Sequence, residues 1–424
     1  MNILVMGSGG REHAICWKIK QSPRVKRLYA APGNGGTGQC AVNADIDILD
    51  NEAVKKFCLE KKIDLVVVGP EIPLSRGITD VLEAAEICVC GPSYAASRLE
   101  SSKIFAKELM GRYGIPTAAF RIFDDAARAE EYINEIGAPV VVKTDGLAAG
   151  KGVIVAADTE EAVKAVRQIL NDKVFGAAGN KIIVEECLVG EEVSVLVMTD
   201  GRNIVPLASS QDHKRAYDGD AGPNTGGMGA YSPAPVVSDK LFDQISREAI
   251  RPVIDGLKED GTPYKGVLYA GVMITEEGPK VLEYNVRFGD PETQAILPRL
   301  KTDIVDLLEA TARGDLSGVH LEWDERDCVA VVLASGGYPG DYTKDKKIYG
   351  IGDAENEGTI VFHSGTKLQN NSLITSGGRV LTIAGMGKGV KKAAENAYRG
   401  VGKIKFDGVM YRKDIGHRAI NRGE

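Results

Sequence analysis

The chain has 424 residues, which is too long for a single hydrophobic core, so we expect two to four domains. A formal net charge of -7 without a basic tract argues against nucleic acid as a partner. The seven cysteines form no regular framework, which indicates a reducing compartment. No basic leader precedes the first strand and no apolar run is long enough to span a membrane, so we expect a cytoplasmic protein with no membrane partner.

The first hundred residues alternate apolar strands with helical stretches. The expected strands are residues 3–6, 28–31, 63–68 and 87–90, and a turn containing Gly or Pro follows each. This order is typical of a parallel, doubly wound sheet, in which ligands bind at the carboxyl ends of the strands. The loops of residues 7–13, 32–36 and 69–71 lie at those ends.

The loop of residues 7–13 resembles a dinucleotide-binding fingerprint but departs from it twice. Glu12 stands where a third glycine is required, and no acidic residue ends the second strand to hold a ribose hydroxyl. An anion at the helix N-terminus and ordinary tight turns of the sheet are both compatible with the loop. A dinucleotide-dependent oxidoreductase is therefore a rival hypothesis with two features against it.

A second unit begins near residue 101, and residues 139–155 in it read as strand, glycine-rich loop and strand. The loop is not a P-loop, because Asp145 replaces its first glycine and Gly152 replaces the Ser or Thr that holds Mg²⁺. Such a hairpin can instead close over a triphosphate, with Lys143 on the strand beneath it. A surface hairpin with solvated lysines is the alternative.

Two further segments suggest binding. Residues 182–194 read as strand, kink and strand, and the backbone of the kink could contact an adenine edge. Residues 212–215 and 222–229 lie in a long polar loop region, and loops of that length inside a domain are usually functional. His213 could act as a general base, or it could be a solvated loop histidine.

Glu283 and Asn285 share one face of a predicted strand, because strand side chains alternate with a period of two. Their oxygens are ligands that Mg²⁺ prefers, and waters and substrate phosphates usually complete its shell. Arg287 lies on the same face if the strand continues, and residues 289–292 predict a turn. The segment therefore predicts a metal and phosphate site; a polar sheet edge is the alternative for the Glu-x-Asn pair alone.

These features occur in the order and spacing of the ATP-grasp superfamily. Within it, the chain resembles the glycinamide ribonucleotide synthetase (phosphoribosylamine-glycine ligase) family along its full length. The segments that carry the resemblance are residues 7–13, 31–34, 68–71, 143–152, 211–215, 222–235, 287–292 and 412–416. The segments around 222 and 287 are the most specific, and neither departs from the family pattern.

The resemblance implies a multidomain fold with α/β and α+β parts. The expected domains are an N-terminal α/β substrate-binding domain with a doubly wound parallel sheet (1–101), an ATP-grasp domain (102–325) and a small C-terminal α+β domain (326–424). A lid subdomain is expected at about residues 124–195. We expect a monomer.

The resemblance also implies ATP-driven amide formation in de novo purine biosynthesis. The glycine carboxylate attacks the γ-phosphate of ATP to give glycyl phosphate. The amine of 5-phosphoribosylamine then displaces phosphate, which yields glycinamide ribonucleotide, ADP and phosphate. Both nucleophiles come from substrates, so the protein supplies positioning and charge, with Mg²⁺ or Mn²⁺ as the cofactor.

The resemblance assigns site residues position by position. The ATP-binding set is Lys103, Lys143, Gly150, Lys151, Gly152, Glu185, Glu186, Leu188 and Glu192. The metal ligands are Glu283 and Asn285. The substrate-binding set is Gly9, Gly10, Arg11, Glu12, Asn34, Pro70, Glu71, Lys214, Asn224, Thr225, Gly226, Gly227, Met228, Gly229, Arg287 and Asp290. The catalytic set is Arg287, Lys143, Asp212 and Asp290.

Two rivals share much of this pattern. Another ATP-grasp ligase of carboxylates and amines would share the central residues but lack the 224–229 loop and the 287–292 set. A catalytically inactive ATP-binding regulator would lose charged groups at the site, and all of them are present in the sequence.

Overall fold

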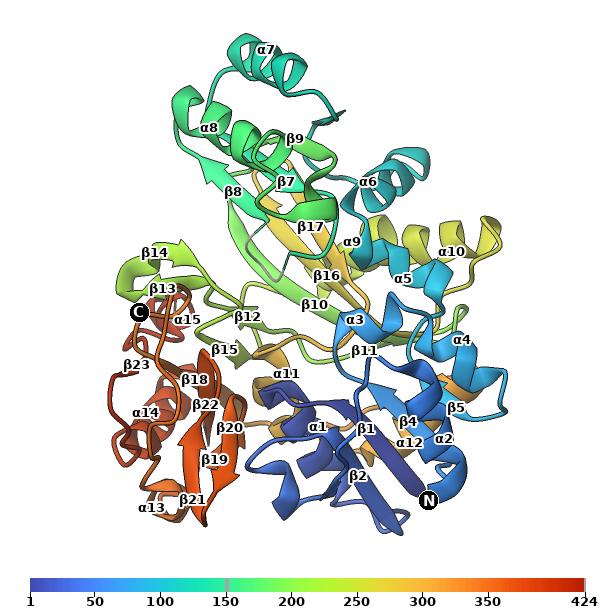
Figure 1. The fold of residues 1–424 in the computed structure, drawn as a ribbon, viewed down its shortest axis with the longest axis vertical. Helices are drawn as coiled ribbons and strands as arrows, with labels where there is room; N and C mark the ends of the chain where they lie inside the picture. Colours follow the sequence, from blue (N-terminus) through green and yellow to red (C-terminus); the bar gives the residue numbers. More distant parts are fainter. Residues whose placement is uncertain (149–151, 423–424) are drawn as a thin grey trace.

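The computed structural model describes residues 1–148 and 152–422, which form four main sheets (Figure 1). The first is parallel, has the order β3-β2-β1-β4-β5, and confirms the predicted doubly wound N-terminal region. Its strands are β1 (Asn2–Gly7), β2 (Arg27–Pro32), β3 (Val42–Asn43), β4 (Leu65–Val68) and β5 (Cys88–Cys90). Its helices are α1 (Gly10–Ile19), α2 (Asn51–Lys61), α3 (Glu71–Leu74), α4 (Ile78–Glu83) and α5 (Tyr94–Ser101).

The strand order of this sheet reverses at β1, since β2 pairs on one side of it and β4 on the other. Ligands of open α/β sheets bind in the crevice at such a switch point. The crevice lies between the loops that follow β1 and β4, at residues 8–9 and 69–70.

The central sheet is antiparallel, with the order β11-β10-β16-β17. Its strands are β10 (Glu191–Thr199), β11 (Ile204–Pro206), β16 (Gly266–Thr275) and β17 (Gly278–Asn285). Helix α6 (Lys103–Arg112) begins the region, and α9 (Asp239–Ile245) continues through a π-helical turn (Ser246–Ile250) into α10 (Arg251–Glu259). β16 and β17 form the predicted hairpin that carries Glu283 and Asn285.

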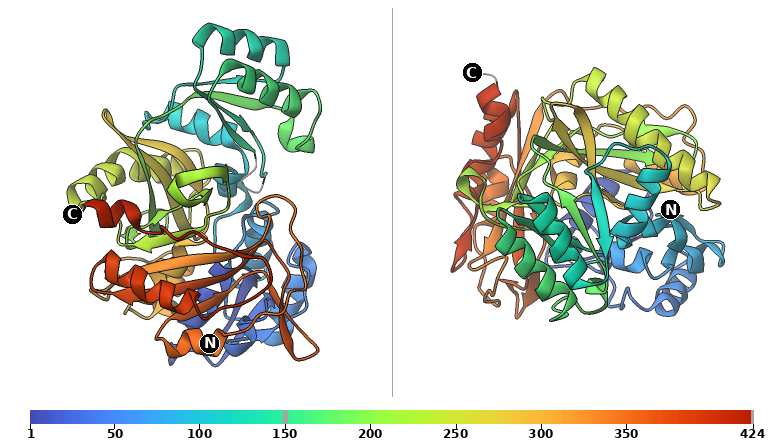
Figure 2. Two further views of the ribbon diagram at one scale, coloured as in Figure 1. Left: turned by 90° about the vertical axis from the view of Figure 1, so that its left-hand side faces the viewer. Right: turned by 90° about the horizontal axis from the view of Figure 1, so that it is seen from above.

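A third sheet, with the order β6-β9-β7-β8, projects from one end of the molecule (Figure 2). It consists of β6 (Phe120–Phe123), β7 (Val140–Thr144), β8 (Val153–Ala156) and β9 (Ile182–Glu186), packed with α7 (Ala126–Ile136) and α8 (Thr159–Leu170). Its apolar residues form a core of their own. The predicted start of α8 is confirmed, because Asp158 caps the helix by accepting from the Glu161 N–H.

The fourth sheet has the order β12-β15-β18-β22-β19, and β23 (Val409–Met410) also pairs with β18. Its strands are β12 (Gln211–Asp212), β15 (Gly229–Ser232), β18 (Asp327–Ser335), β19 (Ile360–His363) and β22 (Arg379–Gly387). Two hairpins accompany it, β13 (Arg215–Tyr217) with β14 (Ala221–Asn224) and β20 (Thr366–Gln369) with β21 (Ser372–Thr375). The remaining helices are α11 (Glu292–Ile296), α12 (Ile304–Arg313), α13 (Ile351–Asn356), α14 (Val390–Val401) and α15 (His417–Arg422).

Two large cores join these sheets. One contains Val66 and Leu74 of the N-terminal region together with Val195 and Leu268 of the central sheet. The other joins α1 and α12 to Phe362 of the fourth sheet. Burial of this apolar surface fixes the three sheets around one junction. The fourth sheet with α14 and the projecting sheet each have a further core of their own.

The seven cysteines are free thiols, as the sequence predicts. No helix among residues 1–148 and 152–422 is both long and apolar enough to cross a membrane.

Candidate active site

One buried carboxylate pairs with two lysines where the projecting sheet meets the central sheet. Lys143 on β7 places its Nζ 2.9 Å from Glu185 Oε2 on β9 and donates to the Leu282 carbonyl at 3.3 Å. Lys107 on α6 lies 3.2 Å from the other oxygen of Glu185. The three side chains are between 2% and 9% exposed, so Lys143 is not a solvated lysine of a surface hairpin. Burial lowers the pKa of Lys107 to about 8, against the attraction of Glu185.

Lys103 connects α6 to the start of the glycine-rich loop. Ser102 caps the helix and donates to Asp145 Oδ1 at 2.9 Å, while the Lys103 N–H donates to the Asp145 carbonyl at 3.0 Å. The Lys103 ammonium donates to the Gly146 carbonyl at 3.2 Å. Of the predicted loop residues, Gly150 and Lys151 lie outside the described residues. Gly152 closes the loop by accepting from the Thr144 N–H at 2.9 Å.

The predicted metal pair shares one face of β17. Asn285 Nδ2 lies 3.4 Å from Glu283 Oε1, and Arg287 donates to Asn285 Oδ1 at 3.0 Å. The sequence prediction that these three side chains face the same side is therefore confirmed. Residues 1–148 and 152–422 contain no group of three or more His, Cys, Asp or Glu side chains that could hold a metal ion by themselves.

The charges around Glu283 suit a divalent cation and phosphates. Burial would raise the pKa of Glu283, but Lys214, Lys143 and Lys103 together lower it below its ordinary value. The carboxylate is therefore ionised. The Asn285 amide NH₂ faces it, while the amide oxygen accepts from Arg287. One carboxylate and one amide on the same strand face supply the kinds of oxygen that Mg²⁺ or Mn²⁺ prefers.

Arg287 is held by carboxylates of the N-terminal region. Its guanidinium lies 2.8 Å from Glu100 Oε1 and 3.5 Å from Glu71 Oε2. Burial raises the pKa of Glu100 to about 7, although Arg287 acts in the opposite direction. Burial would lower the pKa of Arg287, but Glu100 and Glu71 raise it, so Arg287 stays charged.

Asp212 and Lys214 lie near Glu192, and their charges also act with that of Glu283. Lys214 forms an ion pair with Glu192 on β10. Burial raises the pKa of Asp212 to about 8; Lys214 opposes this rise, while Glu292 and Glu192 add to it. His213 between them is fully buried and accepts a hydrogen bond from the Gly416 N–H at 3.1 Å, so it is not a solvated loop histidine.

The kink between β9 and β10 has two distinct surroundings. Glu186 is exposed and accepts from the Ala119 N–H at 3.1 Å, whereas Leu188 is half-buried. Gln211 holds the start of β10 by donating to Glu191 Oε1 at 2.9 Å and to the Glu192 carbonyl at 2.7 Å. The kink is thereby fixed next to Lys214.

Glu12 explains why the first loop is not a dinucleotide site. Its carboxylate accepts from the Gly9 N–H at 2.6 Å and from Arg11 Nε at 2.6 Å. A Cβ at Gly69 would lie 2.1 Å from Glu12 Oε1, so this side chain fills the crevice between the loops after β1 and β4. A pyrophosphate would need that space and the same N–H groups, which contradicts the oxidoreductase hypothesis.

The first loop also contacts the 287–292 turn. Arg11 donates to the Phe288 carbonyl at 3.1 Å. Pro70 precedes α3, whose first residue Glu71 faces Arg287. Gly10 packs against Gln294 and Ser364, because a Cβ there would approach each of them to 2.6 Å. The predicted substrate residues Gly10, Arg11, Pro70 and Glu71 therefore lie around the turn. None of them lines the polar pocket described next.

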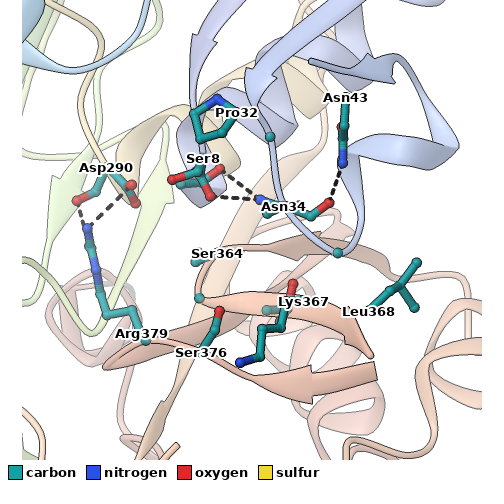
Figure 3. Close-up of a pocket in the computed structure, with 16 residues that line it drawn as sticks. Ser8, Pro32, Asn34, Asn43, Asp290, Ser364, Lys367, Leu368, Ser376 and Arg379 are labelled. Carbon is teal, nitrogen blue, oxygen red and sulfur yellow. Dashed lines mark hydrogen bonds and ion pairs between the residues drawn. The ribbon is translucent and has the colours of Figure 1, made fainter. Parts of the chain in front are cut away.

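A polar pocket of about 700 Å³ opens between the N-terminal loops and the fourth sheet (Figure 3). It includes three predicted substrate residues, Gly9, Asn34 and Asp290. Asn34 donates to the Ser8 carbonyl at 2.9 Å and to the His363 carbonyl at 2.7 Å, so it joins the two walls. The other lining residues are Ser8, Pro32, Gly33, Gly35, Asn43, Ser364, Gly365, Thr366, Lys367, Leu368, Ser376, Gly377 and Arg379.

Arg379 of β22 connects this pocket to the loop of residues 224–229. It donates to the Gly226 carbonyl at 2.6 Å and to the Asp290 carbonyl at 2.8 Å, and it lies 3.3 Å from Asp290 Oδ2. Burial raises the pKa of Asp290, but Arg379 and Arg11 outweigh it and keep the carboxyl ionised. A Cβ at Gly227 would lie 2.3 Å from Pro291 Cδ, so loop and turn pack closely.

The rest of the 224–229 loop runs beside residues 213 and 214. Thr225 donates from its N–H and its hydroxyl to the Lys214 carbonyl, at 2.7 and 2.8 Å. The Met228 N–H donates to the His213 carbonyl at 2.8 Å. Asn224 pairs with Arg215 in the β13–β14 hairpin, and Gly229 begins β15. The loop therefore connects the pocket to the Asp212 side of the site.

Sequence reasoning missed Lys107, Glu100, Arg379 and the pocket wall of residues 364–368. Lys107 had a signal, because it lies four residues after Lys103 and shares its helix face. Arg379 and residues 364–368 had none, since only the packing of the fourth sheet against the N-terminal loops brings them to the pocket.

Three family models match successive parts of the chain. They are the N domain, the ATP-grasp (A) domain and the C domain of phosphoribosylglycinamide synthetase, matched over residues 1–100, 101–293 and 328–418. A phosphoribosylamine–glycine ligase from Ralstonia nicotianae is 51% identical over 423 residues, which cover 100% of both chains. A human trifunctional purine biosynthetic protein is 50% identical over 422 residues, covering 99% of this chain and 42% of the human one.

Solved structures agree with the sequence comparison. The crystal structure of a phosphoribosylamine–glycine ligase from Thermotoga maritima has a TM-score of 0.86 at 33% identity and covers 98% of this chain and 100% of its own. A biotin carboxylase from Campylobacter jejuni shares the fold alone, with a TM-score of 0.74 at 15% identity and coverage of 97% and 93%. Full-length relatives and matching domain models lead to one conclusion: the chain belongs to the phosphoribosylglycinamide synthetase family.

Proposed function

We propose that this protein joins glycine to 5-phosphoribosylamine at the expense of ATP, giving glycinamide ribonucleotide, ADP and phosphate. The observation that supports this best is one continuous arrangement of residues. It runs from the polar pocket, through Asp290 and Arg287, to Glu283, Asn285 and the buried lysines. A polar sugar phosphate suits the pocket, and the cations suit a triphosphate.

We assign ATP to the side where β7, β9 and β17 meet. Lys143 and Lys103 supply positive charge for the phosphates, and the low local dielectric strengthens their attraction to phosphate. We assign adenosine to the kink, with Glu192 toward the ribose. Glu185 pairs with Lys107 and Lys143. We infer that it holds Lys143 in place and thereby orients the nucleotide.

Glu283 and Asn285 would hold a divalent ion. Such an ion would neutralise phosphate charge as the γ-phosphoryl group transfers. We propose Mg²⁺ or Mn²⁺, because the pair consists of one carboxylate and one amide, whose oxygens such ions prefer.

The reaction needs no nucleophile from the protein. A glycine carboxylate oxygen attacks the γ-phosphorus and ADP leaves, which forms glycyl phosphate. The amine of phosphoribosylamine then attacks the acyl carbon and phosphate leaves. We propose that Arg287, charged and fixed by Glu100, orients the glycine carboxylate, and that Asp290 and Asp212 face the incoming amine. Glycyl phosphate must be shielded from water until the amine arrives.

Selectivity for glycine would come from the close packing of the turn against the 224–229 loop. A Cβ at Gly289 would lie 2.4 Å from Glu292 Oε2, and one at Gly227 would meet Pro291. We propose that this closely packed turn forms one wall of the glycine site, so that a side chain on the amino acid would clash with it. Steric exclusion of this kind discriminates strongly against larger substrates.

The test is a reconstitution with omission of single components. One ADP and one phosphate should form per amide only when glycine, phosphoribosylamine, ATP and a divalent ion are all present, and leucine should not replace glycine. Equal turnover with any amino acid, or reduction of a nicotinamide cofactor, would contradict the proposal. We also propose that the enzyme works as a cytoplasmic monomer, which light scattering and cell fractionation would test.

A further inference from the structure

A charged cluster joins residues 213–220 to the C-terminal segment 412–418, and the proposed reaction gives it no role. Arg412 is fully buried and donates to both oxygens of Asp414, each at 2.8 Å. It also donates to Asp220 Oδ1 at 2.8 Å and to the Arg215 carbonyl at 3.2 Å. Arg418 donates to the other oxygen of Asp220 at 2.7 Å. Asp220 is thus fixed by two guanidinium groups from the C-terminal segment.

Hydrogen bonds that involve the backbone join the same two segments. The Gly219 N–H donates to Asp414 Oδ2 at 2.9 Å, and the Lys413 N–H donates to Asp218 Oδ1 at 2.7 Å. Figure 1 shows the β13–β14 hairpin beside α15. Residues almost two hundred positions apart in the sequence are therefore held as one unit.

The C-terminal segment is itself anchored to the fourth sheet. Tyr398 of α14 donates from its hydroxyl to the Arg412 carbonyl at 2.8 Å and accepts from the Ile415 N–H at 3.0 Å. The other face of α14 packs into the core of that sheet. The cluster therefore connects residues 213–220 to a rigid element.

His213 is the point where this cluster reaches the active site. Side chains alternate along an extended segment, so Asp212 and Lys214 face the site while His213 faces away. Its ring lies 5.1 Å from the His417 ring and 6.0 Å from the Tyr231 ring, and its Nε2 accepts from the Gly416 N–H. An Nε2 that accepts leaves the proton on Nδ1, which lies 3.8 Å from Asp220 Oδ1.

The segment that carries Asp212 is short and lies at a sheet edge. β12 has two residues at the edge of its sheet, where it pairs with β15. Asp220 adopts a left-handed backbone with φ of 53°, which non-glycine residues rarely adopt without surrounding support. Besides the hydrogen bonds from residues 225–229, contacts from the C-terminal segment therefore help to fix where Asp212 and Lys214 lie.

We propose that residues 412–418 are a positioning element of the active site, which holds Asp212 and Lys214 in their working geometry through His213 and Asp220. This inference rests on the proposed function, because Asp212 and Lys214 act in that reaction. In this scheme His213, Asp220 and residues 412–418 do not contact a substrate. They act through Asp212 and Lys214, which do.

The test substitutes the shared carboxylate. Asp220→Asn keeps the size and tolerates a left-handed backbone, but it removes the charge that both arginines contact. We expect kcat/KM to fall about 10- to 100-fold, the scale of a small misplacement of reacting groups. Asp324→Asn is the matched control, because Asp324 also pairs with an arginine at 2.7 Å and is similarly exposed, at 21% against 29%. The control should keep wild-type kcat/KM.

A coupling measurement separates positioning from general damage. In the Lys214→Arg background, Asp220→Asn should lower kcat/KM by a factor at least about threefold smaller than in the wild-type background. The reason is that the effects of coupled residues are not additive in free energy. If Asp220→Asn folds and matches the control, or if its effect multiplies fully with Lys214→Arg, the proposal is wrong.

Folding is checked by circular dichroism and thermal melting. Should Asp220→Asn fail to fold, Arg418→Gln removes one contact from a half-buried side chain, and its expected loss is about threefold with the same coupling to Lys214→Arg. Wild-type kcat/KM in that variant would overturn the proposal. Failure of the wild-type enzyme to form the amide would instead refute the proposed function, so the two failures are distinguishable.

Discussion

Lys143 and Lys107 both pair with Glu185, so substituting each in turn gives a controlled test of the proposed phosphate site. Lys143→Met and Lys107→Met each remove one ammonium from the same buried carboxylate and put an apolar chain of similar length in its place. Glu185 keeps one ammonium partner in either variant. Only Lys143 contributes to the charge around Glu283, whereas Lys107 donates to the Thr117 hydroxyl at 2.6 Å.

The expected magnitudes differ for stability and for catalysis. Each variant loses the contact with Glu185 and a second hydrogen bond, that of Lys143 to the Leu282 carbonyl or of Lys107 to the Thr117 hydroxyl. Such bonds contribute about 1.5–3 kcal/mol each before the relief of burying an ammonium is counted. Because Glu185 stays paired, the larger cost of an uncompensated buried charge does not arise. Lys143→Met should also lower kcat by about 10²-fold or more, the effect of removing one electrostatic contact to the reacting group. Lys107→Met should lower kcat by less than about 10-fold.

Urea denaturation followed by circular dichroism measures the first effect, and release of ADP under saturating substrates measures the second. The reasoning is refuted if Lys143→Met turns over ATP like the wild type. It is also refuted if the two variants lose kcat equally, since Lys107 would then face the nucleotide as Lys143 does.

Three further predictions test other parts of the site. Glu283→Gln should require a much higher divalent-ion concentration for activity, whereas Asp290→Asn should change mainly the KM for substrates. If Glu283→Gln and the wild type respond equally to added metal, the metal assignment is wrong and β17 is only a polar sheet edge. Arg379→Gln should raise the KM for phosphoribosylamine more than the KM for ATP, because it releases the Gly226 and Asp290 carbonyls at the pocket. Glu100 should make stability depend on pH, because its pKa rises from 4.5 to about 7 on folding. The protonated carboxyl contributes fully to the free energy of unfolding below pH 4.5, and this contribution is lost as pH rises through 7. From pH 4.5 to 8 the wild type should therefore lose up to about 3 kcal/mol of unfolding free energy relative to Glu100→Gln, as measured by urea denaturation.

The sequence by itself determined the local parts of this site. The period of a strand placed Glu283, Asn285 and Arg287 on one face, and hydrogen bonds confirm it. Alternating strands and helices predicted the parallel N-terminal sheet, and the departures of the first loop from the dinucleotide fingerprint were real: Glu12 fills the space that a pyrophosphate would take. Such features depend on neighbours within a few residues, which the sequence shows directly.

Tertiary structure decided which distant groups meet. Only the packing of α6 against the projecting sheet gives Lys143 a carboxylate shared with Lys107. Only the second core brings Arg379 beside Asp290, and the buried state of His213 depends on residues two hundred positions away. No local pattern records these contacts, because burial of apolar surface elsewhere sets how the sheets pack, and the polar groups are then brought together at the junction.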